Sequence, residues 1–194
     1  MRIIAGQCKG RKLISLPGMH TRPTSGRVRE SIFSILSSEV PNRHVLDLFA
    51  GTGAMGLEAL SRGAASACFT DNTQKNLSVI RENIRRCRQE KHCRLFCRDI
   101  LKNLYFLQAQ KERFDLVFID PPYQQQMAAK VLENLMHSHA LAPDAKIVLE
   151  HSRTEKIPEN IPDLEMKDQR RYGKSFVSFF TYKGSEDSPE NSPD

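Results

Sequence analysis

The chain has 194 residues, 39% of them hydrophobic, and a formal net charge of +6, which is typical of one soluble globular domain. No apolar run approaches the roughly 18 residues of a membrane span. Gln7 and Lys9 interrupt the N-terminal apolar stretch, so we expect no signal peptide and a cytoplasmic location. The five cysteines include no C-x-x-C pair, which argues against a disulfide framework.

The N-terminal part of the chain is basic. Residues 2–5 and 11–16 predict two short strands around Lys9-Gly10, and we assign residues 1–20 to a β-hairpin extension. Residues 1–29 contain no acid and seven bases, namely Arg2, Lys9, Arg11, Lys12, Arg22, Arg27 and Arg29. A basic arm of this kind indicates a polyanionic partner. The alternative is a solvated N-terminus that serves only solubility.

Strands and helices alternate after a first helix near residues 26–38. The predicted strands are 44–49, 66–70, 93–97, 114–119 and 145–150, and the predicted helices are 54–62, 73–90, 100–110 and 127–138. Alternation of this kind indicates an α/β fold with a mostly parallel sheet covered on both faces. Residues 164–171 and 175–182 predict an antiparallel hairpin at its edge. We assign 21–183 to this domain and 184–194 to a disordered acidic tail.

A glycine loop follows the first strand of that domain. The string Gly51-Thr52-Gly53-Ala54-Met55-Gly56 lies between a predicted strand and a predicted helix, which is the context that gives G-x-G-x-x-G its meaning. Asp71 lies 20 residues after Gly51 and can accept hydrogen bonds from ribose hydroxyls. This pattern fits a dinucleotide as well as S-adenosylmethionine.

Further acids favour S-adenosylmethionine. Asp47 precedes the loop and suits a cationic ligand better than a pyrophosphate, and Asp99 can reach the adenine amine. Acids end, or nearly end, four successive strands, although acids also commonly mark strand ends and turns. The predicted cofactor-binding residues are Asp47, Phe49, Ala50, Gly51, Thr52, Gly53, Asp71, Asn72, Asp99 and Ile100.

The fourth of these acids begins Asp120-Pro121-Pro122-Tyr123. Two consecutive prolines lack N–H donors and end the strand in a stiff turn. The turn offers a carboxylate and a carbonyl as acceptors for an exocyclic amine, and an aromatic ring for stacking on a base. We predict Asp120, Pro121, Pro122 and Tyr123 as catalytic residues. The alternative is a strand-ending turn with a packed tyrosine.

A zinc site is the other chemistry that the cysteines could support. Cys87, His92, Cys93 and Cys97 are close in sequence, but their spacing matches no standard ligand pattern. We therefore expect no metal.

The motifs together resemble one family. Arg2-Ile3-Ile4-Ala5-Gly6, Lys9-Gly10-Arg11-Lys12-Leu13, Arg22-Pro23-Thr24, Val28-Arg29-Glu30, Leu46–Gly53, Gly56–Gly63 and Asp120–Tyr123 resemble the bacterial 16S ribosomal RNA guanine-N2 methyltransferases of the RsmD type. The resemblance covers residues 1 to about 182. Cys8 departs from it, because the family often has an aromatic residue there.

This resemblance implies a Rossmann-like class I methyltransferase with a seven-stranded sheet. It implies S-adenosylmethionine as the donor and a small-subunit guanine, within a partly assembled ribosomal subunit, as the target. We expect a monomer without membrane contact. The residues expected to contact RNA are Arg2, Lys9, Arg11, Lys12, Arg22 and Arg27.

Three other functions compete with this interpretation. A DNA adenine-N6 or cytosine-N4 methyltransferase would share the Asp120–Tyr123 chemistry, but the chain is too short for a separate base-recognition domain. An NAD-dependent oxidoreductase would explain Gly51–Gly56 and Asp71 but leave Asp120–Tyr123 without a role. A non-catalytic RNA-binding protein is opposed by the intact acids.

Overall fold

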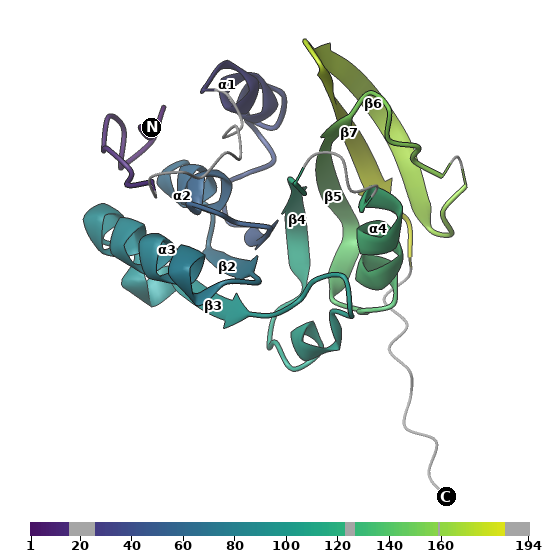
Figure 1. The fold of residues 1–194 in the computed structure, drawn as a ribbon. Helices are drawn as coiled ribbons and strands as arrows, with labels where there is room; N and C mark the ends of the chain where they lie inside the picture. The colour runs from purple at the N-terminus through teal and green to yellow at the C-terminus, as the bar shows by residue number, and fades with distance from the viewer. Residues whose placement is uncertain (16–25, 123–126, 159, 185–194) are drawn as a thin grey trace, which may run out of the picture.

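The computed structural model describes residues 1–15, 26–122, 127–158 and 160–184, which contain a seven-stranded sheet with helices on both faces (Figure 1). The strands lie in the order β3-β2-β1-β4-β5-β7-β6. The first five in this order are parallel, and β7 runs antiparallel to both β5 and β6. The strands are β1 (His44–Leu48), β2 (Ser66–Asp71), β3 (Cys93–Cys97), β4 (Phe114–Ile119), β5 (Leu141–Ser152), β6 (Leu164–Tyr172) and β7 (Ser175–Tyr182).

Helices cover the sheet in two layers, because alternate residues of the central strands face opposite sides. The helices are α1 (Gly26–Ile35), α2 (Ala54–Ser61), α3 (Gln74–Cys87) and α4 (Ala128–Met136), with 3-10 turns η1 (Glu90–His92) and η2 (Tyr105–Leu107). Val45 and Phe118 pack in one core with α1, α2 and α3. Leu46 and Val117 pack in the other with α4 and η2. None of the helices in the described ranges is long and apolar enough to cross a bilayer.

The predicted helix over residues 100–110 is wrong. Asp99 and Asn103 accept hydrogen bonds from the backbone two residues later, which forms turns instead of a helix. The carbonyl of Ile100 accepts from the side chain of Asn134 on α4, at 2.9 Å. This acceptor would serve the residue four positions later in a helix, so the segment forms only η2.

The two predicted N-terminal strands are also reduced. One antiparallel bridge joins Arg2 to Lys12, and Ile3 N–H donates to the carbonyl of Arg11 at 3.0 Å. Leu13 N–H donates to the carbonyl of Met1, also at 3.0 Å, so residues 1–15, which we call the N-terminal segment, form a short closed turn outside the main sheet. The predicted boundary at residue 20 lies outside the described residues, as do residues 185–194 of the predicted tail.

Candidate active site at the carboxyl edge of the sheet

Four aspartates gather at one edge of the sheet. Asp47 lies within β1 and Asp71 ends β2, while Asp99 and Asp120 follow β3 and β4. These strands are parallel neighbours in the order β3-β2-β1-β4, so their carboxyl ends point the same way. In such sheets, ligands bind outside the carboxyl ends of the strands, where the strand order reverses. Here the order reverses between β1 and β4.

The loop between β1 and α2 has an unusual backbone. Phe49, Gly51 and Gly53 have φ angles of 58°, 54° and 74°, and positive φ is uncommon for a bulky residue such as Phe49. The loop is closed by hydrogen bonds from Ala50 N–H to the carbonyl of Thr70 and from Gly53 N–H to the carbonyl of Ala50. Sparsely populated backbone conformations cluster at ligand sites, so this strain supports a binding role for the loop.

Asp47 is buried beside that loop. Its Oδ2 accepts from the backbone N–H of Gly56 in α2, and burial is the main cause that raises its pKa to about 8. The Gly56 hydrogen bond lowers the pKa, whereas the negative charges of Asp120 and Asp71 raise it. The interior at this edge is therefore short of positive charge, which a cationic ligand would supply.

Asp71 holds the loop to the start of α3. One oxygen accepts from Gly51 N–H at 3.0 Å, and the other accepts from Thr73 and from the Asn76 side chain. Asp71 is 5% exposed, so a ribose hydroxyl would have to share one of these oxygens. Asn72, beside it, is exposed.

Asp99 and Ile100 lie at the β3 end of the edge. Asp99 is exposed, and its Oδ1 accepts from Leu101 N–H at 3.1 Å. The Ile100 side chain is buried in the α4 core, so only its backbone is placed to meet a ligand. Asn134 fixes that backbone through hydrogen bonds to the carbonyls of Ile100 and Leu101.

The predicted catalytic turn begins directly after β4. Asp120 is half-buried, Pro121 is buried and Pro122 is exposed. The carboxylate of Asp120 is close enough to Asp47 to raise the pKa of that group. Tyr123 lies outside the described residues.

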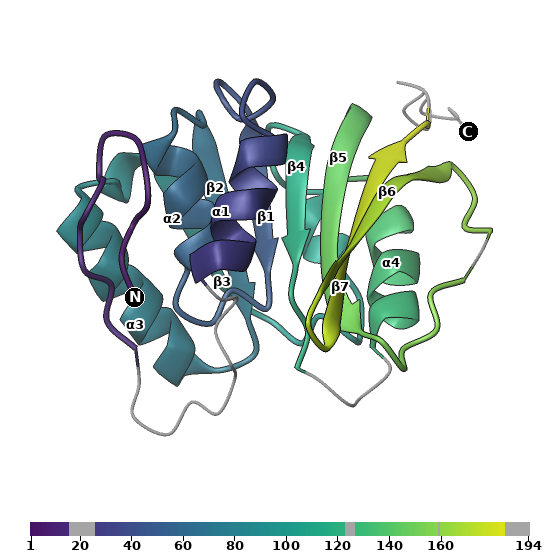
Figure 2. The same ribbon diagram turned by 90° about the horizontal axis from the view of Figure 1, so that it is seen from above.

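The basic side chains of the N-terminal segment lie elsewhere. Arg2, Lys9, Arg11 and Lys12 are exposed, and the segment lies beside α2 and α3 in both views (Figures 1 and 2). A guanidinium N–H of Arg11 donates to the carbonyl of Arg86, in the last turn of α3. Arg27 is exposed in the first turn of α1, and Arg22 lies outside the described residues.

Buried polar residues that the sequence reasoning did not assign hold this segment in place. Glu58 of α2 is 0% exposed and accepts from the backbone N–H groups of Ile4 and Ala5, at 2.8 and 3.0 Å. Arg29, 1% exposed, forms an ion pair with Glu58 at 3.7 Å and donates to the carbonyl of Arg2. Burial is the main cause that lowers the pKa of Arg29. The position of the charged Glu58 between Leu57 and Ala59 in an apolar helix is the feature of the sequence that could have indicated this buried ion pair.

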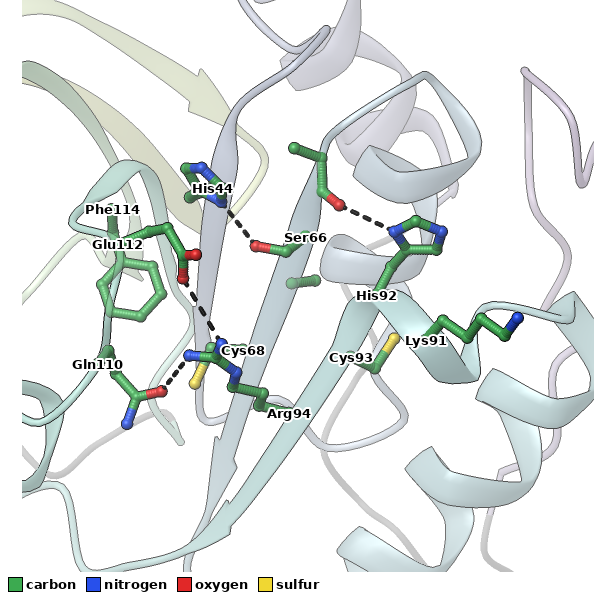
Figure 3. Close-up of a pocket in the computed structure, with 12 residues that line it drawn as sticks. His44, Ser66, Cys68, Lys91, His92, Cys93, Arg94, Gln110, Glu112 and Phe114 are labelled. Atoms are coloured by element: carbon green, nitrogen blue, oxygen red, sulfur yellow. Dashed lines mark hydrogen bonds and ion pairs between the residues drawn. The ribbon is translucent and has the colours of Figure 1, made fainter.

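A cavity occupies the opposite edge of the sheet (Figure 3). Its walls include His44, Ser66, Cys93 and Phe114, the first residues of β1, β2, β3 and β4. Arg94 reaches across it to Gln110 and Glu112 (Figure 3). The cavity is thus remote from the four aspartates. Within the described ranges, no group of three or more His, Cys, Asp and Glu side chains is arranged to hold a metal ion.

Comparison with known proteins identifies the family of this chain. The family model described as "Conserved hypothetical protein 95" matches residues 1–181. The chain is 34% identical to "Ribosomal RNA small subunit methyltransferase D" of Haemophilus influenzae, over 86% of this chain and 88% of that protein. It is 35% identical to YlbH of Bacillus subtilis, over 95% of this chain and all of that protein. The chain belongs to the RsmD family.

Solved structures give the same answer for the fold. The yhhF protein of Escherichia coli matches with a TM-score of 0.82 and 30% identity, over 95% of this chain and 99% of that one. The family model, which begins at residue 1, includes the N-terminal segment as well as the sheet. The fold of this RsmD family member is that of a class I methyltransferase with a C-terminal antiparallel hairpin.

Proposed function

We propose that this RsmD family member transfers a methyl group from S-adenosylmethionine to the exocyclic N2 of a guanine in 16S ribosomal RNA. The observation that carries the proposal is Asp120-Pro121 at the end of β4, beside Asp47 on the edge where the strand order reverses. The coarser activity, an rRNA methyltransferase, follows from relatives named "Ribosomal RNA small subunit methyltransferase D" in Haemophilus influenzae and Escherichia coli.

The residues at the edge fit this donor. Burial, with a further contribution from the negative charges of Asp120 and Asp71, raises the pKa of Asp47, and a ligand with cationic amino and sulfonium groups would offset this. Gly53 has a φ of 74°, which side chains other than glycine rarely adopt, and a Cβ there would also crowd Ile80 and Phe69 atoms at 3.2 Å. The exposed carboxylate of Asp99 and the backbone of Ile100 would meet the adenine, and Asp71 the ribose. When bound, the donor supplies an electrophilic methyl group attached to a positively charged sulfur.

Asp120 and Pro121 would position the nucleophile. The N2 lone pair of guanine is delocalised into the ring, which makes the amine a poor nucleophile. If the Asp120 carboxylate and the Pro121 carbonyl each accept one N–H, the nitrogen becomes pyramidal and its lone pair is directed away from the ring. The carboxylate also offsets the positive charge that develops on nitrogen. Most of the rate gain comes from positioning.

The target base has to leave its helix or loop to reach this turn. We assign Tyr123 to stacking on the extruded base. As the N–C bond forms, the C–S bond breaks and its electron pair goes to sulfur. The amine then loses one proton, and the Asp120 carboxylate is the nearest assigned acceptor.

The exposed bases of the N-terminal segment and Arg27 would contact RNA phosphates. We propose a small ribosomal subunit or its assembly intermediate as the substrate, a monomer as the active form, and the cytoplasm as its location.

The test is transfer of a labelled methyl group to small subunits isolated from cells that lack this modification. Nucleoside analysis should find N2-methylguanosine. For Asp120→Ala, the single-turnover rate should fall roughly ten- to a hundredfold, because a charge-assisted hydrogen bond contributes about 1.5–3 kcal/mol. Affinity for S-adenosylmethionine should change little.

Asp168→Asn is the matched control, since this half-buried carboxylate lies on β6 and pairs with Arg170 two residues later. Its rate should equal that of the wild type. Label recovered in N6-methyladenosine, or label accepted by DNA instead of the subunit, would contradict the guanine-N2 assignment. A wild-type rate in Asp120→Ala would remove Asp120 from the mechanism.

A further inference from the structure

Asn83 of α3 joins two parts of the molecule that lie far apart in sequence. Its side chain is 0% exposed. Its Oδ1 accepts from the backbone N–H of Ile14 at 2.7 Å, and its Nδ2 donates to the carbonyl of the same residue at 3.0 Å. The Nδ2 group also donates to the carbonyl of Thr52 at 2.9 Å. Both N–H groups of the amide and its carbonyl are thus in use.

Each partner of Asn83 belongs to a different binding element. Thr52 lies between Gly51 and Gly53, whose backbones have positive φ in the glycine loop. Ile14 lies two residues after the exposed base Lys12 in the N-terminal segment. Asn83 therefore connects the cofactor loop to the basic arm through a single buried amide.

The N-terminal segment lies outside the sheet and is tied both to itself and to the methyltransferase domain. Its own turn is closed by backbone hydrogen bonds from Ile3 N–H to Arg11 and from Leu13 N–H to Met1. Side chains of the domain also hold its backbone, with Glu58 at Ile4 and Asn83 at Ile14. Gly6 fits against Ser61 so closely that a Cβ would stand 1.7 Å from the Ser61 carbonyl oxygen. These interactions form together when the segment docks and break together when it separates.

We propose that Asn83 couples RNA binding on the N-terminal segment to donor binding at the glycine loop. This inference rests on the proposed function for the identity of the two ligands. RNA that binds Lys12 favours the docked segment, which keeps Asn83 against Thr52 and holds the loop in its binding shape. By thermodynamic reciprocity, donor binding at the loop favours docking of the segment by the same factor.

Reciprocity gives a test that needs no RNA. Hydrogen exchange is measured on the full chain with and without S-adenosylhomocysteine, following the backbone N–H groups of Ile4 and Ile14. In the wild type, the ligand should slow exchange at both positions about fivefold or more, which is the lower end of typical coupling. In Asn83→Ala the segment should exchange at the same rate with and without ligand.

Asn134→Ala is the matched control. Asn134 is also a buried asparagine whose Nδ2 donates to two carbonyls, those of Ile100 and Leu101. These hydrogen bonds lie on the other face of the sheet from α3, since Ile100 and Leu101 pack in the core of α4 and the apolar residues of α3 pack in the opposite core. Affinity for S-adenosylhomocysteine should weaken in this variant, but saturating ligand should still slow exchange at Ile14. Asn83→Asp provides a second variant, since it keeps the acceptor for Ile14 N–H and loses the donor to Thr52.

Two results would overturn the coupling. One is ligand binding to the wild type without any change in exchange at Ile4 and Ile14, a result that does not depend on how well the variants fold. The other is ligand-dependent protection that persists in Asn83→Ala. The proposed function fails separately, because it would be contradicted by the nucleoside analysis even if the exchange results are as expected.

Discussion

The backbone N–H of Gly56 donates a hydrogen bond to Oδ2 of Asp47 across 2.9 Å, and Asp47 is only 3% exposed. Burial raises the pKa of Asp47 to about 8, so its carboxyl group is mostly protonated at pH 7 in the free protein. A cationic ligand stabilises the carboxylate and lowers this pKa. Ligand binding below pH 8 therefore releases a proton.

The first prediction concerns the pH dependence of donor affinity. Proton release means that affinity rises with pH up to about 8 and levels off above it, by at most about tenfold per pH unit for one proton. The donor's own α-amino group titrates near 7.7–8.0, as α-amino groups do, and its loss of charge opposes this rise. The informative quantity is therefore the difference in S-adenosylmethionine affinity between the wild type and Asp47→Asn, measured by calorimetric titration from pH 6 to 9. Parallel pH profiles for the two proteins would show that Asp47 does not titrate.

The second prediction concerns Gly56. A Cβ at this position would stand 2.4 Å from Cε1 and 2.8 Å from Cζ of Phe69, and 3.3 Å from Oδ2 of Asp47. Gly56→Ala should therefore destabilise the protein by about 1–3 kcal/mol through overpacking, and it should weaken donor binding by displacing Asp47. Urea unfolding and calorimetry measure the two effects.

Gly26→Ala is the control for this prediction, because a Cβ at the first residue of α1 meets no atom within 4 Å. This variant should be as stable as the wild type or more stable. Phe69→Leu should recover part of the stability lost in Gly56→Ala, since it removes the ring atoms that the new methyl group meets. If the single variant Gly56→Ala has the same free energy of unfolding as the wild type, α2 can shift and is not held tightly against Phe69.

Local sequence pattern was enough to locate several strands of the sheet and their ends. The predicted strands 93–97, 114–119 and 175–182 coincide with β3, β4 and β7. Each is a short run rich in apolar residues, and Asp120-Pro121 ends β4 after Ile119 for a purely local reason. Since the acids follow these strand ends directly, the sheet edge that carries them was predictable as well.

Interactions between distant residues were not predictable in this way. Glu58 binds Ile4 from 54 positions away, and Asn83 binds Ile14 from 69 positions away. The apolar spacing of Ile100, Leu104 and Leu107 is helical, yet these side chains reach the core from turns and η2, because Asn134 occupies the carbonyls of Ile100 and Leu101. Periodicity reports which residues are buried, but not which backbone acceptors a distant side chain will take.

The third prediction concerns Glu58. Glu58→Ala should lower the free energy of unfolding by about 3–5 kcal/mol, because it leaves Arg29 buried without its acidic partner and removes the acceptor for Ile4 N–H. Urea unfolding measures this change. Trypsin should also cleave the variant faster after Lys9 and Arg11, since the N-terminal segment loses the acceptor that holds its Ile4 and Ala5 backbone N–H groups.

Glu82→Ala is its matched control. Glu58 pairs with Arg29 and Arg62, and Glu82 likewise pairs with two arginines, Arg85 and Arg86, but on the surface of α3. Exposed pairs contribute about 0–1 kcal/mol, so this variant should unfold near the wild-type urea concentration and resist trypsin equally. Equal losses in the two variants would show that burial of Glu58 adds nothing to its role.

The fourth prediction concerns the basic residues of the N-terminal segment. Replacement of Lys9, Arg11 and Lys12 by glutamine should weaken binding to small ribosomal subunits. It should also reduce the slope of log affinity against log salt, by roughly 0.7 for each single-strand phosphate that is no longer neutralised. The control replaces Lys111, Lys130 and Lys183, three exposed lysines on other parts of the fold, and changes the net charge equally. Filter binding across a salt series separates the two triples. If the slope is about two units lower in the first triple variant alone, Lys9, Arg11 and Lys12 bind phosphates directly. If the two triple variants have equal slopes, these residues act only through the net charge of the protein.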